Sequence, residues 1–338
     1  MESIFRATGT DADRHFHKTA KQNRKMGNRL EKVVQQLATE AHTLRAKGIA
    51  LVLSGAVLWG VSGTIAQYLF QHLQMDMQWL TVMRLLVSGL LLLGFCYGRE
   101  RNRVTGVWKD PASRRDLIFF AVFGMLGVQY TYFAAIRYGN AATATILQSL
   151  ECVIVPCFLA ARFRRMPGRR TLFAVFLAVA GTFLLVTHGS FTTLSISGKA
   201  LFWGILTAFT AAFYTLQPIK LLHQWGADVT VGWGMLIGGA VLSFIHPPWH
   251  AAGNFSPAAV PGIAFVILFG TLVAFLCYLE GLKYLSASET TVLATAEPLS
   301  AAFLTVVWLH VPLGFFDWAG ALMIISTIFI LALKGKHA

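Results

Sequence analysis

Ten apolar runs follow residue 47, and their number and length constrain the fold more than any other feature of the chain. Each holds roughly the 17–25 residues that a helix needs to cross about 30 Å of hydrocarbon. None shows the alternation of a membrane-spanning strand. The sequence therefore predicts an all-α integral membrane protein with ten transmembrane helices, at 48–70, 79–97, 116–136, 141–161, 171–187, 198–219, 229–246, 260–282, 287–309 and 314–333.

Composition excludes several other classes. Hydrophobic residues make up 56% of the chain and charged residues only 13%, whereas a soluble domain carries about a quarter charged residues. The four cysteines lie in apolar runs without a CxxC pair, and the histidines lack metal-ligand spacing, so we expect neither disulfides nor a metal site. No Walker A, HExxH or GxSxG motif occurs. We therefore expect no cofactor and no enzyme.

The basic residues indicate an orientation. Lys and Arg number ten in the segment 1–47, six in 98–115 and five in 162–170. If the helices alternate, these segments share one side with Lys220, Lys283, Lys334 and Lys336, and the opposite side carries only Arg137 and Lys199. Cytoplasmic loops are enriched in Lys and Arg, so both termini are predicted to be cytoplasmic. The net charge of +13 then faces anionic lipid, and nucleic acid is not an expected partner.

Residues 1–47 form a basic tail. Apolar residues recur in it at helical spacing, which predicts an amphipathic helix that is solvated or lies on the membrane surface. They are Leu30, Val33, Val34, Leu37, Ala41 and Leu44. The basic part is too long for a signal peptide, and Met26 is a second candidate start.

The chain repeats itself. "YFAAIRYGNAATATILQSLE" (132–151) aligns with "YLEGLKYLSASETTVLATAE" (278–297), and Gly124 and Gly270 keep the same offset. The repeat unit is predicted to contain five helices, 48–187 and 198–333. Because five is odd, the second copy must enter the membrane from the opposite face. Such inverted repeats are typical of secondary transporters that work by alternating access.

The tract "YLEGLKYLSASETTVLATAEPLSAAFLTVVWL" resembles the repeat signature of the drug/metabolite transporter superfamily, EamA type, and "RRTLFAVFLAVAGTFLLV" is similar to that family's fifth helix. The resemblance covers about 48–333. It implies ten helices, a pocket between the halves and alternating access without ATP. Three departures leave the substrate open: proline is delayed to Pro156 in the first half, helix nine closes with "WLHVPLG", and the tail is longer than usual.

Two carboxyls occupy equivalent positions in the repeats. Glu151 and Glu297 fall near the midpoints of the predicted helices 141–161 and 287–309. An ionisable group there costs at least a few kcal/mol, so each should face the bundle interior. We expect them to carry a proton or to pair with a cationic substrate group. The alternative is a structural carboxyl bonded to neighbouring hydroxyls.

Arg84 lies five residues inside the second predicted helix. If it points inward it can hold a substrate carboxylate, and if outward it snorkels to the external interface. An inward Arg84 together with Glu151 and Glu297 would suit a zwitterion such as an amino acid.

Further candidates surround these charges. Gln148 lies one turn before Glu151, and Pro156 and Pro298 are expected to kink their helices and free a carbonyl. Five aromatic residues occupy helices that, by the resemblance, line the pocket and could bind an amine by cation–π attraction; core packing is the alternative for each. They are Trp59, Tyr130, Tyr132, Tyr214 and Tyr278.

The sequence thus predicts a secondary active transporter of a small metabolite, with an amino acid or related amine as the expected substrate. Export is the favoured direction, and we expect transport by alternating access to be linked to protons. The expected location is the bacterial cytoplasmic (inner) membrane, and the expected partners are the lipid bilayer and a small-molecule substrate. The sequence does not decide whether the protein forms a homodimer. The alternatives are an importer or facilitator of the same fold or, in a different class, a membrane-embedded lipid-processing enzyme.

Overall fold

The computed structural model describes residues 43–164, 166, 168–190, 194–257, 259–281, 283–285, 290 and 293–332. The chain divides into two units, Met1–Gly48 and Ile49–Ala338. The predicted tail helix lies almost wholly outside the described residues, and within the first unit only 43–48 are described, as helix.

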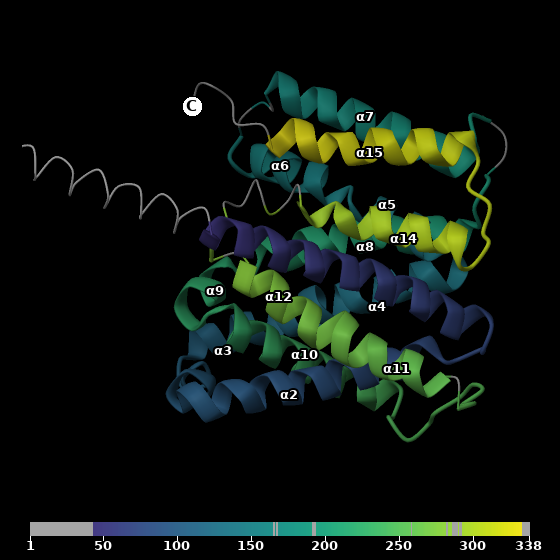
Figure 1. The fold of residues 1–338 in the computed structure, drawn as a ribbon. Helices are drawn as coiled ribbons and strands as arrows, with labels where there is room; N and C mark the ends of the chain where they lie inside the picture. The colour runs from purple at the N-terminus through teal and green to yellow at the C-terminus, as the bar shows by residue number, and fades with distance from the viewer. Residues whose placement is uncertain are drawn as a thin grey trace, which may run out of the picture. The chain divides into compact units, whose positions relative to one another are not determined.

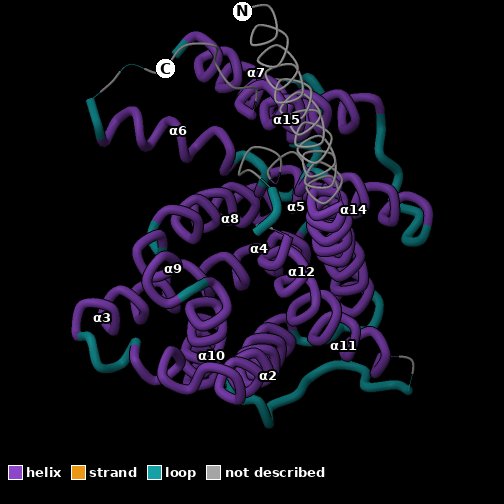
Figure 2. The backbone as a smooth tube through the Cα atoms, turned by 60° about the vertical axis from the view of Figure 1, so that its left-hand side comes forward, coloured by secondary structure: helices purple, strands orange, loops and turns teal. Residues whose placement is uncertain are grey.

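Every regular element of the described residues is helical (Figure 2). Within the described ranges, eight helices are long and apolar enough to cross a bilayer. They are Thr43–Gln71, Met77–Gly106, Pro111–Tyr138, Ala141–Arg162, Arg169–Thr187, Gly198–Leu216, Ala227–Ile245 and Ala259–Gly281. Two shorter apolar helices, α14 (Ala296–Val307) and α15 (Phe315–Ala332), follow. A further short helix, α9 (Ile219–Trp225), precedes Ala227–Ile245.

Polar side chains mark where several helices begin. Asp76 accepts a hydrogen bond from the Trp79 amide at the start of α2 (Met77–Gly106). Asn140 caps α5 (Ala141–Gln148), and Ser197 caps α8 (Gly198–Leu216), each by accepting from the amide three residues on. These caps satisfy amides that have no partner within their own helix, so each helix starts where its sequence supplies a short polar side chain.

Helix pairs from the two halves of the chain pack side by side. The helix α7 (Arg169–Thr187) lies along α15, and α2 lies along α10 (Ala227–Ile245), as both views show (Figure 1, Figure 2). Each pair is antiparallel, because residue numbers rise along one helix while the residues that they contact on the other helix fall in number. Gly89 faces Leu236 and Gly232, whereas Gly239 faces Leu86.

Glycines bring α7 and α15 into close contact. A Cβ at Gly181 would lie 2.8 Å from the Gly320 carbonyl oxygen, and one at Gly320 would lie 2.5 Å from the Gly181 carbonyl oxygen. Farther along, Ala174 and Ala178 pack against Ile330 and Leu331. Small residues that let backbones approach are typical of helix interfaces in membranes.

Two helices contain a π-helical segment at equivalent positions. Helix Pro111–Tyr138 consists of α3 (Pro111–Phe119), η1 (Phe120–Leu126) and α4 (Gly127–Tyr138). Helix Ala259–Gly281 likewise consists of α11 (Ala259–Ile267), η2 (Leu268–Val273) and α12 (Ala274–Gly281). The aligned glycines Gly124 and Gly270 lie inside η1 and η2.

A side chain at either of these glycines would meet close neighbours. A Cβ at Gly270 would overlap the Ser62 side chain of the first helix. A Cβ at Gly124 would lie 2.9 Å from the Phe120 ring of its own segment and in ordinary contact, at 3.5 Å, with the Tyr214 Cα of α8. The segment η2 therefore marks a close crossing with the first helix. π segments often occur at functional sites.

Candidate functional site

The helix that carries Glu151 is interrupted just before it. The predicted continuous helix 141–161 is divided into α5, which ends at Gln148, and α6 (Glu151–Arg162). At the interruption the Leu150 amide donates to the Leu147 carbonyl, a tight i to i−3 bond. Glu151 is therefore in the first turn of α6, where the Cys152 and Val153 amides donate to the Ser149 and Leu150 carbonyls. Pro156 lies inside α6.

Glu297 has the equivalent position in the second half. Thr295 is the N-cap of α14, and Glu297 lies in the first helical turn. Pro298 is the third residue of α14, a position where the missing N–H breaks no helical hydrogen bond. It thus lies at the start of a helix rather than in the middle of one.

Glu151 and Glu297 interact electrostatically. Both side chains are half-buried. Tyr278 of α12 interacts electrostatically with both carboxyls, and Tyr214 of α8 with Glu151. Residues from four elements and from both halves of the chain therefore meet around the acid pair.

Arg84 points inward, which decides the orientation that the sequence left open. It is 4% exposed, its Nε donates to Thr271 Oγ1 at 3.1 Å, and its guanidinium lies 4.3 Å from the centre of the Phe133 ring. It is within electrostatic range of Glu297 and Tyr132. Among the described residues, neither Arg84 Nη1 nor the Tyr132 hydroxyl has a hydrogen-bond partner, although both are buried. Orphaned buried polar atoms call for an explanation, and a bound ligand supplies one.

Trp59 and Gln148 lie at the edges of this group. Trp59 packs against Tyr278 and Phe275, with ring centres 5.0 Å apart in each case. The Gln148 side-chain oxygen accepts from Thr207 Oγ1 at 3.3 Å. We name Glu151, Glu297, Arg84, Tyr132, Tyr214, Tyr278 and Trp59 the central site.

Tyr130 is engaged elsewhere. Its hydroxyl accepts from Gln78 Nε2 at 3.0 Å, and its ring packs on Trp203 at 5.7 Å. It lines a cavity of about 280 Å³ together with polar residues from the start of α2 and the end of α4. We name this space the vestibule. A second cavity of about 280 Å³, between α6, α7 and α8, is lined almost wholly by apolar side chains, Leu150 and Val175 among them.

Sequence reasoning missed the groups that position the charges. Thr271 and Phe133 hold the Arg84 guanidinium. Gly60 allows the first helix to approach α14, since a Cβ there would lie 2.5 Å from the Glu297 carbonyl oxygen. The small residues in "GVSGT" (60–64) were the available signal, because small residues mark close helix contacts.

Metal chemistry has no support in this part of the molecule. No group of three or more His, Cys, Asp or Glu side chains that could hold a metal ion occurs among the described residues. Cys96, Cys152, Cys157 and Cys277 are free thiols.

Many apolar spans and a buried site of opposite charges define a multi-pass membrane protein of the transporter class. The EamA-like transporter family matches this chain twice, over 46–187 and 198–333. The "Uncharacterized inner membrane transporter YicL" of Salmonella typhimurium (strain LT2) is 39% identical over 291 residues, which cover 86% of this chain and 97% of that protein. The chain belongs to the EamA-like transporter family, with its two-repeat architecture, and is a transporter rather than an enzyme.

More distant relatives are similar. The "Uncharacterized transporter YwfM" of Bacillus subtilis (strain 168) is 26% identical over 289 residues, covering 85% of this chain and 94% of that protein. A solved crystal structure, described only as that of a protein, aligns with a TM-score of 0.61 at 14% identity, over 87% of this chain and all of the other. That likeness concerns the fold alone.

Proposed function

We propose that this protein is a secondary active transporter that moves a small metabolite, an amino acid or a related amine, across the bacterial cytoplasmic membrane, with export favoured. The observation that carries the proposal is the pair Glu151 and Glu297, which lie within electrostatic range of each other and of buried groups from both halves. Ionisable residues within membrane spans mark substrate or proton pathways.

The architecture of the proposal is ten helices in two inverted five-helix repeats. In it α14 and α15 count as the ninth and tenth spans. The antiparallel packing of α2 with α10 and of α7 with α15 supports this arrangement, because each pair joins the same helix of the two repeats. Helices related by a two-fold axis in the membrane plane run in opposite directions where they meet.

The charges favour a zwitterionic cargo. A carboxyl of the acid pair would hold an ammonium group, and Arg84 Nη1, which has no described hydrogen-bond partner, would hold a carboxylate. The faces of Trp59 and Tyr278 add a surface for the ammonium. A carboxyl that releases the ammonium on taking up a proton would link transport to a proton gradient.

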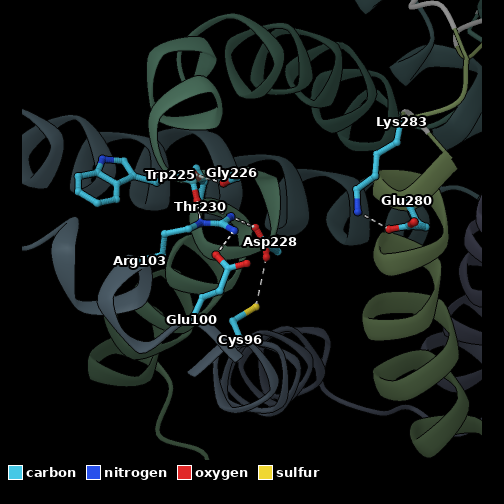
Figure 3. Close-up of polar contacts among 9 residues, drawn as sticks. All are labelled: Cys96, Glu100, Arg103, Trp225, Gly226, Asp228, Thr230, Glu280 and Lys283. Atoms are coloured by element: carbon cyan, nitrogen blue, oxygen red, sulfur yellow. Dashed lines mark hydrogen bonds and ion pairs between the residues drawn. The ribbon is translucent and has the colours of Figure 1, made fainter. Parts of the chain in front are cut away.

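The test is exchange of labelled amino acids by the purified protein in liposomes, across a panel of amino acids and at several pH values. We expect Glu151→Gln and Glu297→Gln to lower exchange by about tenfold or more, because each removes a charge-assisted contact to the ammonium. The matched control is Glu280→Gln, since Glu280 pairs with Lys283 beyond the end of α12 (Figure 3). The proposal is overturned if both site variants exchange every cargo at the wild-type rate.

An importer or facilitator of the same fold is the second reading, since repeats related by inversion carry no information about direction. A proton gradient imposed across the liposomes separates these readings. Movement of cargo against its own concentration gradient, in the direction opposite to proton flow, supports proton-linked export. Exchange at a rate that does not depend on the proton gradient supports facilitated passage.

A further inference from the structure

The vestibule is a small space with a mixed lining. It lies between the start of α2, the end of α4 and the start of α8, and its volume is about 280 Å³. Gln78, Tyr130 and Arg137 supply polar groups, and Trp203 supplies an aromatic face. Ligand pockets begin at about 300 Å³, so the volume suits a solute of amino-acid size.

One cation, Arg137, lines the vestibule, and a second, Lys199, contacts a lining residue. The described partners of Arg137 are the Phe70 carbonyl and the Gln74 side-chain oxygen, both neutral. The Lys199 ammonium lies 5.2 Å from the centre of the Tyr138 ring, and that ring lines the vestibule. Arg137 and Lys199 are also the two Lys/Arg residues that the charge pattern places on the outer side.

The nearby carboxylate is directed elsewhere. Asp76 lines the vestibule, but Oδ1 accepts from the Trp79 amide at 2.9 Å and Oδ2 lies 3.4 Å from His246 Nε2. It caps α2 and pairs with His246, so it does not form the partner of Arg137. A guanidinium on a concave surface whose described hydrogen bonds go to neutral oxygens can attract the anionic group of a small solute.

We propose that the vestibule binds the carboxylate of a small solute at Arg137 and Lys199, as an outer station on the route to the central site. The solute's apolar part would lie on Trp203 and Tyr130. That the solute is the transported cargo rests on the function proposed above; the binding itself does not.

The test uses a cysteine placed in the vestibule, Ala252→Cys, because Ala252 is small, exposed and part of the lining. The full-length protein in liposomes is treated with an anionic and a cationic methanethiosulfonate of similar size, with the protein lacking Ala252→Cys as background. We expect the anionic reagent to react faster. Arg137→Gln and Lys199→Gln should each lower the ratio of anionic to cationic rates by about fivefold at low salt.

Charge-preserving variants separate electrostatics from folding. Arg137→Lys and Lys199→Arg should keep the ratio near that of the parent, and Lys220→Gln, distant in sequence on the inner side, should leave it unchanged. Glycine and acetate should slow the labelling, whereas ethanolamine, an amine without a carboxylate, should not.

Three results would overturn the proposal: no labelling of Ala252→Cys by either reagent, a ratio unaffected by both Gln variants, or equal protection by ethanolamine and glycine. None depends on transport. The labelling experiment tests carboxylate binding in the vestibule, and the exchange experiment with the Glu151 and Glu297 variants tests the proposed function. Either proposal can therefore fail while the other is supported.

Discussion

Arg103 Nη2 lies 2.6 Å from Asp228 Oδ1, and this ion pair joins the end of α2 to the start of α10 (Figure 3). Arg103 also donates to the Trp225 carbonyl oxygen from two nitrogens. At the other end of the same helix pair, Asp76 Oδ2 lies 3.4 Å from His246 Nε2. Each end thus joins an acid at the start of one helix to a base at the end of the other.

Removing the Arg103 contact should loosen the two helices. We expect Arg103→Gln to lower the apparent melting temperature, and a double-mutant cycle with Asp228→Asn to give a coupling of about 1 kcal/mol, because the pair is partly exposed. Arg115→Gln is the control, since its pair with Asp116 is sequence-local and Arg115 is largely exposed. Equal melting temperatures for Arg103→Gln and Arg115→Gln would contradict a role for this pair in joining the helices.

Gly60 is a site where a single methyl group should matter. A Cβ there would lie 2.5 Å from the Glu297 carbonyl oxygen and 3.0 Å from the Ala301 amide nitrogen. Gly60→Ala must therefore displace backbone, at a cost of about 1–3 kcal/mol, and move Glu297. Gly94→Ala is the matched control, because nothing lies within 4 Å of its Cβ position; it should be neutral or slightly stabilising. Thermal unfolding of both variants checks this, and similar losses from both would refute the crowding argument.

Arg84 should resist replacement by lysine. A lysine keeps the charge but loses the Nε bond to Thr271 and the flat contact with Phe133. In exchange competition, we expect Arg84→Lys to weaken inhibition by amino acids about tenfold while changing inhibition by simple amines little, because only the former use a carboxylate. Thr271→Val serves as a control, because it removes the same hydrogen bond but leaves the Arg84 guanidinium in place. Parallel losses for amines and amino acids would argue against a carboxylate role.

The proposed topology places 162–170 and the loop around Ala252 on opposite sides of the membrane. In intact cells, an impermeant thiol reagent should label Ala252→Cys, whereas Gly168→Cys should be labelled only after permeabilisation. Both positions are exposed in the structure. Labelling of both in intact cells would invalidate the assigned orientation.

Asp110 gives one pH-dependent contribution outside the spans. The Ser113 hydroxyl, at 2.6 Å, and the Ser113 amide, at 3.1 Å, donate to its carboxylate and hold the pKa of Asp110 below its ordinary value. A lowered pKa in the folded state stabilises the protein above the ordinary pKa, and this contribution is lost as pH falls through the lowered value. Asp110→Asn should therefore melt below wild type at neutral pH, with the difference shrinking near pH 3. A gap of constant size at both pH values would be inconsistent with this linkage.

Hydropathy alone located two of the candidate spans closely. The predicted run 171–187 corresponds to Arg169–Thr187, and 229–246 to Ala227–Ile245. The end of the predicted run 79–97 was placed too early, because α2 continues to Gly106 past a non-helical Glu100. The reason is physical: an apolar run marks the part of a helix that lies in hydrocarbon, and a helix can continue into water beyond that part.

The candidate site was predicted in part. Repetition and burial singled out Glu151 and Glu297, but the interruption at Ser149 and Leu150 left no trace in hydropathy, because both residues are also common within helices. The inward orientation of Arg84 depends on Thr271, almost two hundred positions later in the chain. Contacts of that kind arise from tertiary packing, and no local pattern encodes them.

The segments η1 and η2 each hold one wide turn, and tyrosines follow them directly: Tyr130 and Tyr132 after η1, and Tyr278 after η2. Returning a wide turn to ordinary α geometry advances the register by one residue, which swivels everything beyond it by about 100° and 1.5 Å. Each half of the chain thus has a wide helical turn upstream of a tyrosine of the central site, Tyr132 or Tyr278. A change of register at that turn would rotate the tyrosine relative to the acids without bending the helix.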